Sequence, residues 1–168
     1  MATSQIEEGV KRIILIPVDD SDNSEYAWEW YLQYEMQKGD SVIFMHVLQP
    51  KITASAERRG SLTLDVPINF DKDVAKAMDT CASAAKKISA HFTKAAKDAD
   101  VPSKVLLESG SSPGSVIVKA AHDHAVQLVI LGSRGVGTMR RTFLGSVSDY
   151  VVHHINVPVV VVPPADSK

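Results

Sequence analysis

Residues 128–154 read LVILGSRGVGTMRRTFLGSVSDYVVHH, which predicts a strand, a loop and a helix in direct succession. The apolar run LVIL is typical of a strand buried on both faces, and it ends at Gly132. A loop with three arginines follows, and the Gly-Ser pair at 145–146 opens a second apolar segment with helical spacing. A buried strand that leads through a loop into a helix is the repeating unit of an α/β fold.

The rest of the chain repeats this unit. Apolar, β-branched runs predict strands at 11–19, 41–50, 102–109, 126–131 and 157–162. Amphipathic segments predict helices at 21–40, 71–100, 112–124 and 146–155. Strands that alternate with helices need crossover connections, so we expect one three-layer domain with a five-stranded parallel sheet and helices on both faces. Such sheets bind ligands at the carboxyl ends of their strands, where the strand order changes direction.

The clearest helix is 71–100, which carries apolar residues along one face and Lys and Asp opposite. The apolar face consists of Val74, Ala77, Met78, Cys81, Ala84, Ala85, Ile88, Phe92, Ala95 and Ala99. We therefore expect Cys81 to lie in the core. In the next helix, Ser112 is predicted to be the N-cap and Pro113 the first helical residue.

Length and composition set the limits of the interpretation. The 168 residues suffice for one domain, which we expect to span 1–168 with its core at about 11–163. A net charge of −2 does not favour nucleic acid or an acidic membrane surface as the main partner. The single cysteine excludes an internal disulfide and a multi-cysteine metal site. No apolar run is long enough to span a membrane and the first residues do not resemble a secretory signal, so we expect a cytoplasmic protein.

One segment, 49–71, does not fit the alternation of strands and helices. It is longer than an ordinary connection between a strand and a helix. We expect a surface insertion there, with a mobile lid near the site as the alternative. The tetrapeptide RRGS at 58–61 resembles a basic-directed kinase site with Ser61 as the acceptor, although an exposed loop without modification explains it equally.

Several motifs are rejected on chemical grounds. GSSPG at 110–114 matches the nucleophile elbow of hydrolases, but the residue after the serine is proline, whose missing N–H would be half of the oxyanion hole. GVGTMR at 135–140 lacks the third glycine of a dinucleotide fingerprint, and the chain has no P-loop. The six histidines lack ligand spacing and are interpreted as surface residues, so no metal site and no catalytic residue is predicted.

The loop in 128–154 retains a functional interpretation. Glycine at the end of a strand lets backbone N–H groups approach an anion, and the start of the following helix adds unpaired N–H groups and a positive dipole. Arg134, Arg140 and Arg141 would add charge beside a phosphate. Ser146 and Asp149 also resemble a capping box, and a hydroxyl at this position could serve the backbone or a phosphate.

The order and spacing of these motifs resemble the universal stress protein family. The similarity rests on G-x-x-G-x(9)-G-[ST] from Gly132 to Ser146, on IPVDDSDNS at 16–24, and on GSVSDYVVHHINVPVVVV at 145–162. It covers nearly the whole chain, from Arg12 to Val162. It implies an adenine nucleotide alpha-hydrolase-like, Rossmann-like fold with five parallel strands, and a homodimer formed by antiparallel pairing of the last strands.

The resemblance to the ATP-binding branch of the family also implies a site. Adenosine would lie against the end of the first strand, with Asp19 accepting hydrogen bonds from the ribose hydroxyls, and adenine would contact the backbone at the end of the second strand. Phosphates would lie on the glycine-containing loop. The implied site residues are Pro17, Val18, Asp19, His46, Val47, Gly132, Ser133, Arg134, Gly135, Gly145, Ser146, Val147 and Ser148. ATP is the expected ligand, and Asp19 or Asp20 could recruit Mg²⁺.

The last strand provides a physical argument for the dimer. VPVVVV, at Val157–Val162, is apolar throughout, and as the last strand it should lie at a sheet edge. Such an edge invites aggregation unless it is covered or paired, and pairing with a second copy is the self-complementary solution. A covering helix is the alternative, and we expect none after Val162.

Three functions remain open at this level. The first is an ATP-binding dimeric stress-response regulator. The second is a slow ATPase or phosphoryl-transfer enzyme, which would need a positioned base that the sequence does not identify. The third is an interaction module without nucleotide. The complete glycine pattern favours the first two, and the stress, the pathway and the protein partner are not specified by any motif.

Overall fold

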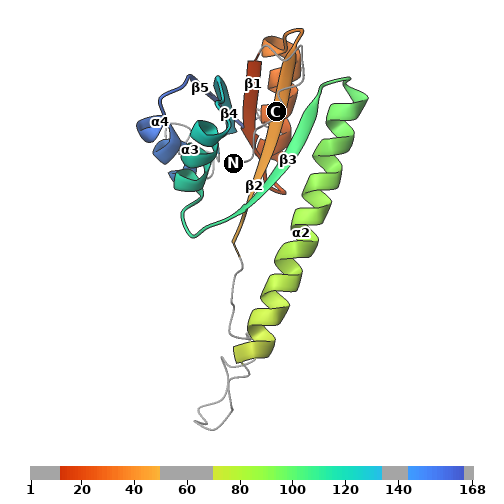
Figure 1. Ribbon diagram of the computed structural model, residues 1–168, viewed down its shortest axis with the longest axis vertical. Helices are drawn as coiled ribbons and strands as arrows, with labels where there is room; N and C mark the ends of the chain where they lie inside the picture. Colours follow the sequence, from red (N-terminus) through yellow and green to blue (C-terminus); the bar gives the residue numbers. More distant parts are fainter. Residues whose placement is uncertain (1–11, 50–69, 134–143, 165–168) are drawn as a thin grey trace.

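A five-stranded parallel sheet forms the centre of the molecule (Figure 1). The computed structural model describes residues 12–49, 70–133 and 144–164. The strands are β1 (Arg12–Pro17), β2 (Asp40–Leu48), β3 (Ser103–Ser109), β4 (Leu128–Gly132) and β5 (Val159–Val162). Their order in the sheet is β3-β2-β1-β4-β5, and every neighbouring pair is parallel. The predicted α/β fold is confirmed.

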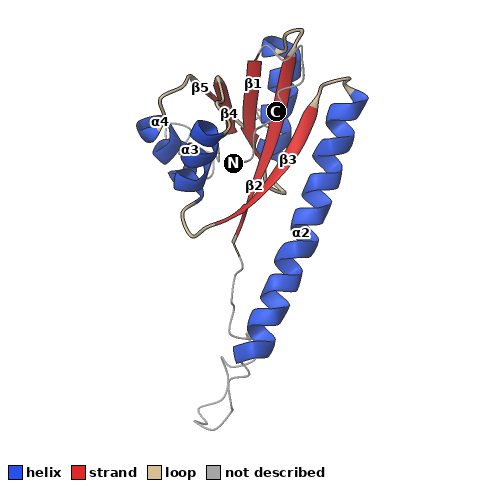
Figure 2. Cartoon of the chain, viewed as in Figure 1, coloured by secondary structure: helices blue, strands red, loops and turns tan. Residues whose placement is uncertain are grey.

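Helices cover both faces of the sheet (Figure 2). They are α1 (Asp22–Trp30), the π-helix η1 (Tyr31–Glu35), α2 (Phe70–Asp98), α3 (Pro113–Asp123) and α4 (Ser146–His154). Alternate strand residues point to opposite faces, so β1 contributes Ile14 and Ile16 to the core beneath α1 and α2 and Leu15 to the core beneath α3 and α4. In place of the single helix predicted at 21–40, the chain forms α1 and then η1, and the helical segment ends at Glu35.

Helix α2 is longer than the sheet that it covers. Its 29 residues extend about 43 Å at 1.5 Å per residue, whereas a strand of six residues reaches only about 20 Å. Ile88 and Phe92 are buried against the sheet, but Met78 is 58% exposed. Figure 1 shows the amino-terminal half of the helix extending past the strand ends. The predicted core face of this helix is correct for its second half and wrong for Met78 and Ala84.

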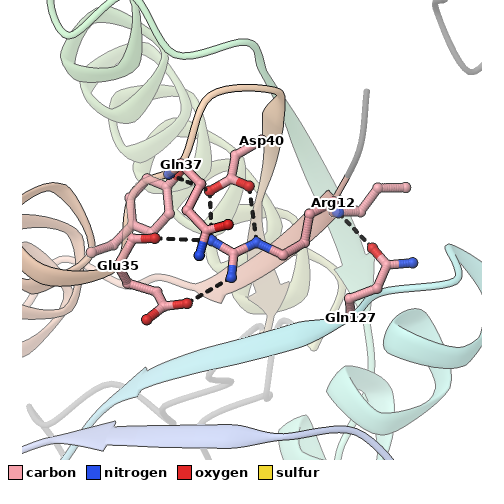
Figure 3. Close-up of polar contacts among 7 residues, drawn as sticks. Arg12, Glu35, Gln37, Asp40 and Gln127 are labelled. Atoms are coloured by element: carbon pink, nitrogen blue, oxygen red, sulfur yellow. Dashed lines mark hydrogen bonds and ion pairs between the residues drawn. The ribbon is translucent and has the colours of Figure 1, made fainter. Parts of the chain in front are cut away.

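A partly buried ion pair joins the amino ends of β1 and β2 (Figure 3). The Arg12 guanidinium donates to both carboxylate oxygens of Asp40, at 2.9 and 2.8 Å, and to Glu35 at 2.6 Å. The Tyr31 hydroxyl and the Gln37 N–H also donate to Asp40, each at 3.0 Å. Every buried polar side-chain atom of this cluster thus has a partner, which is what makes a buried charge tolerable.

The same contacts shift the pKa values of the cluster. Burial alone would raise the pKa of Asp40, but the hydrogen bonds from Arg12, Gln37 and Tyr31 outweigh it and hold that pKa below its ordinary value. Burial beside Asp40 raises the pKa of the Tyr31 phenol, and the hydrogen bond to Asp40 raises the pKa of Arg12. The cluster lies at the opposite end of the strands from their carboxyl ends, so we assign it a structural role.

Two further features concern the edge of the sheet and the character of the helices. Strand β5 is an edge strand, as expected, and its valines 159–161 are half-buried. Within the described residues, no helix combines the length and apolar character that crossing a membrane requires.

Candidate functional site

A cleft of about 1230 Å³ opens at the carboxyl ends of β1, β2 and β4. Strand β1 has β2 on one side and β4 on the other, so the sheet changes direction here, and open α/β sheets bind ligands at this point. The cleft exceeds the range of about 300–1000 Å³ typical of small-molecule pockets. Its described lining comes from residues 17–24, 45–49, 76–88, 113–117, 131–132 and 145–148.

The fold brings together most of the residues predicted for the site. Those that line the cleft are Pro17, Val18, Asp19, His46, Val47, Gly132, Gly145, Ser146, Val147 and Ser148. Ser133 does not line it; its N–H donates to the Val162 carbonyl at 2.8 Å and holds β4 to β5. Arg134, Gly135, Arg140, Arg141 and Ser61 lie outside the described residues. The ligand contacts of all these residues stay predictions.

Asp19 is held in place by the turn that starts α1. Its Oδ1 accepts hydrogen bonds from the Ser21 N–H at 3.0 Å, from the Ser21 hydroxyl, and from the Ser24 hydroxyl at 2.9 Å. The Ser24 oxygen in return accepts from the Asp19 N–H at 2.8 Å, and Ser24 is only 5% exposed. The two serines thus fix the carboxylate at the cleft. They were not among the residues predicted for the site, although an aspartate that accepts from the backbone N–H two residues later forms a known type of turn.

His46 joins the ends of the first two strands. Its Nδ1 lies 2.8 Å from the Val18 carbonyl oxygen, and the Val18 N–H donates to the Met45 carbonyl at 2.8 Å. Because a carbonyl only accepts, this geometry assigns the hydrogen to Nδ1 and leaves Nε2 as an acceptor in the neutral ring. His46 lines the cleft and is half-buried, whereas the side chain of His122 is 90% exposed.

Gly132 is required by the approach of α1. A Cβ at this position would lie 2.2 Å from the Asn23 carbonyl oxygen and 2.7 Å from its carbonyl carbon. The sequence pattern suggested that this glycine allows the approach of an anion. The structure shows a different and sufficient cause, which is that the first turn of α1 packs directly onto the end of β4.

The amino end of α4 differs from the capping-box interpretation. Gly145, not Ser146, is the N-cap, and no side chain caps this end. Ser146 is the first helical residue and is exposed to the cleft, whereas the buried Ser148 donates its hydroxyl to the Gly145 carbonyl at 2.9 Å. The Ser146 hydroxyl is therefore not committed to capping. The first N–H groups of the helix and its dipole favour an anion here.

Helix α2 forms one wall of the cleft. Lys76, Thr80 and Cys81 line it on this side, together with small alanines. The expectation that Cys81 lies in the core is wrong, because the residue is partly exposed and lines the cleft. Helical periodicity could not separate a core face from a cleft wall, since both are apolar stripes. Among the described residues, no three ligand-type side chains are grouped to hold a metal ion.

A model of the universal stress protein family matches residues 11–163. The chain belongs to this family. The Arabidopsis thaliana universal stress protein PHOS34 is 30% identical over 177 residues, which cover 99% of this chain and 67% of PHOS34. Universal stress protein MJ0577 of Methanocaldococcus jannaschii is 28% identical over 154 residues, which cover 89% of this chain and 93% of MJ0577.

Solved structures of the family share the fold. A structure of MJ0577 superposes with a TM-score of 0.73 at 27% identity and covers 94% of this chain and 99% of its own. An Arabidopsis thaliana universal stress protein, At3g01520, with AMP bound superposes with a TM-score of 0.64 at 18% identity, covering 93% of this chain and 97% of its own. At that identity the second structure shows the fold alone.

The cleft of this universal stress protein brings three kinds of polar group together. It offers one oriented carboxylate, backbone groups at two strand ends, and the positive end of a helix. The carboxylate can accept hydrogen bonds, the backbone groups can donate or accept them, and the amino end of the helix favours a negative group.

Proposed function

We propose that this universal stress protein is a cytoplasmic, dimeric regulator that binds ATP in the cleft at the carboxyl edge of its sheet. The observation that carries the proposal is the convergence, in one cleft, of Asp19, the end of β2 at His46 and Val47, and the amino end of α4. Family membership and the AMP bound to the Arabidopsis thaliana protein At3g01520 support an adenine nucleotide as the ligand class.

Each part of the nucleotide has a proposed position. The adenosine lies against Pro17, Val18 and Asp19, and the carboxylate of Asp19 accepts from the ribose hydroxyls. Adenine contacts the backbone at Val47. The phosphates lie near Gly132 and the Gly145–Ser148 turn, and Ser133, Arg134 and Gly135 belong to the same proposed set.

Regulation fits the described residues better than catalysis does. Phosphoryl transfer needs a base or water-positioning group beside the transferred phosphate. The carboxylates that line the described cleft, Asp19 and Asp20, belong to the β1 end, where the ribose is proposed to lie. The activity of the regulator would instead depend on whether the nucleotide is bound. Mg²⁺ would be bound together with the phosphates.

Calorimetry of the nucleotide-free protein tests the proposal. We expect stoichiometric ATP binding in Mg²⁺, with clearly weaker binding of GTP because the base meets backbone groups in a fixed order. 2′-Deoxy-ATP should also bind more weakly, because Asp19 would lose one hydroxyl partner. The Asp19→Asn variant should lose this preference for ribose, whereas Asp98→Asn, on the exposed side of α2, should not. Absence of heat with every adenine nucleotide would contradict the proposal, and turnover of ATP would show in the same samples.

A further inference from the structure

The hydrogen bonding between β1 and β2 changes at the cleft. The strands pair in register up to Pro17, which lies opposite Met45, and the Val18 N–H continues the pattern by donating to the Met45 carbonyl at 2.8 Å. In a regular parallel ladder, the carbonyl of the same residue accepts from an N–H two positions further along the partner strand. The next rung would therefore join the Val18 carbonyl to the Val47 N–H.

His46 supplies a different donor for that carbonyl. Its Nδ1–H donates to the Val18 oxygen at 2.8 Å, and within residues 12–49 no hydrogen bond joins the Val47 N–H to Val18. The His46 side chain thus satisfies the last carbonyl at the end of β1. The backbone of β2 continues to Val47, whose N–H makes no hydrogen bond to Val18. Val47 lines the cleft, and its N–H and carbonyl, like those of Met45, point to the β1 side of β2.

We propose that His46 is a positioning residue that keeps the Val47 backbone available to the ligand by occupying the Val18 carbonyl. The inference rests on the proposed function. The N–H and the carbonyl of Val47 are a donor beside an acceptor, which matches the ring nitrogen and the exocyclic amine on one edge of an aminopurine. His46 acts through Val18 and Val47 and makes no ligand contact of its own.

Removal of the imidazole should allow β1 and β2 to form a hydrogen bond at the position where the ligand is proposed to bind. In His46→Ala the Val18 carbonyl loses its donor, and the Val47 N–H, the next group along, should take its place and extend the ladder by one rung. The ligand then competes with a backbone hydrogen bond, and we expect a loss of affinity of roughly tenfold or more.

Two amide substitutions separate positioning from direct contact. In His46→Asn the side-chain NH₂ can occupy the position of Nδ1 and donate to Val18, whereas in His46→Gln it lies nearer the position of Nε2. We expect the Asn variant to bind ATP within about threefold of the wild type and the Gln variant to resemble Ala. His122→Ala, which removes a 90% exposed histidine from α3, is the control.

The test combines ATP calorimetry on these variants with NMR hydrogen exchange of the Val47 amide in the absence of ligand. Fast exchange of Val47 in the wild type and the Asn variant, with protection in the Ala and Gln variants, supports the proposal. Wild-type affinity in folded His46→Ala overturns it, and so does rescue by Gln but not Asn, which would assign a direct contact to Nε2. If the wild type binds no adenine nucleotide, the proposed function fails, and the exchange of Val47 alone then decides the role of His46.

Discussion

At the scale of single residues, the cleft is organised by small polar groups that the chain provides close in sequence. Asp19 is oriented by Ser21 and Ser24, and His46 by Val18. The sequence predicted Asp19, His46 and Val18 as site residues, but it did not predict a role for Ser21 and Ser24, which hold Asp19. The reason is physical: a serine inside a helix pattern is compatible with either solvent or a buried hydrogen bond, and only packing decides between the two.

Ser24→Ala tests the orientation of Asp19. The buried hydroxyl both donates to the carboxylate and accepts from the Asp19 N–H, so its removal takes one partner from each group. We expect a loss of about 1–2 kcal/mol in the free energy of unfolding and a roughly tenfold loss of ATP affinity. Ser115→Ala, on the exposed side of α3, should change neither quantity. Unchanged affinity in Ser24→Ala would mean that the ligand does not depend on this turn.

Gly132→Ala separates the two explanations of that glycine. The added Cβ would collide with the backbone carbonyl of Asn23, which cannot move without displacing α1, so we expect a loss of at least about 2 kcal/mol in stability measured by urea denaturation. Ser115→Ala, on the exposed side of α3, is the control and should leave the stability unchanged. Wild-type stability with abolished nucleotide binding in Gly132→Ala would instead favour the anion explanation.

At the scale of elements, the ion pair of Arg12 and Asp40 ties β1, β2 and η1 together at the end of the sheet remote from the cleft. No sequence motif indicated it, since its residues are separated by 28 positions along the chain. The strands and the helix spans, in contrast, were largely predictable, because each carries its own periodicity. The extension of α2 past the end of the sheet was not predictable, because helical periodicity gives no information on the length of the sheet that the helix covers.

Asp40→Asn should weaken this connection in a pH-dependent way. The folded protein holds the pKa of Asp40 below its ordinary value of 3.8, so the ionised group stabilises the fold above that pH and the contribution is lost as the pH falls through the folded pKa. We expect the variant to lose about 2–3 kcal/mol at pH 7 and the difference from wild type to shrink below about pH 3.8.

Urea denaturation from about pH 7 down to about pH 2.5 provides the measurement, since the contribution of the carboxylate should begin to fall once the pH drops below the ordinary pKa of the group. Asp98→Asn is the control, since its partner Lys94 is 77% exposed and such surface pairs contribute little. Two curves that stay parallel down to the lowest pH would show that the stability contribution of Asp40 does not depend on its charge.

At the scale of the whole molecule, the two edges of the sheet offer a direct comparison. On β5, the even-numbered positions bond β4, as the Pro158 and Val162 carbonyls do, so the N–H of Val161 faces the outer edge. On β3, the Pro102 carbonyl and the Gly110 N–H bond β2, so the N–H of Leu107 faces the opposite outer edge. A proline at either position removes one N–H from the outer edge of the sheet and leaves every hydrogen bond between neighbouring strands in place.

If two copies pair through β5, Val161→Pro should shift the protein from dimer to monomer in analytical ultracentrifugation, while Leu107→Pro should leave the dimer intact. The antiparallel pairing of two β5 strands uses the Val161 N–H of both copies, so the substitution removes two hydrogen bonds and places two rings in the interface. Thermal unfolding of the diluted monomer should change little, because the core valine of this strand, Val162, keeps its bond to β4. A dimer that survives Val161→Pro but dissociates in Leu107→Pro would place the interface on β3, and ATP titration of the monomer would then show whether each copy holds its site alone.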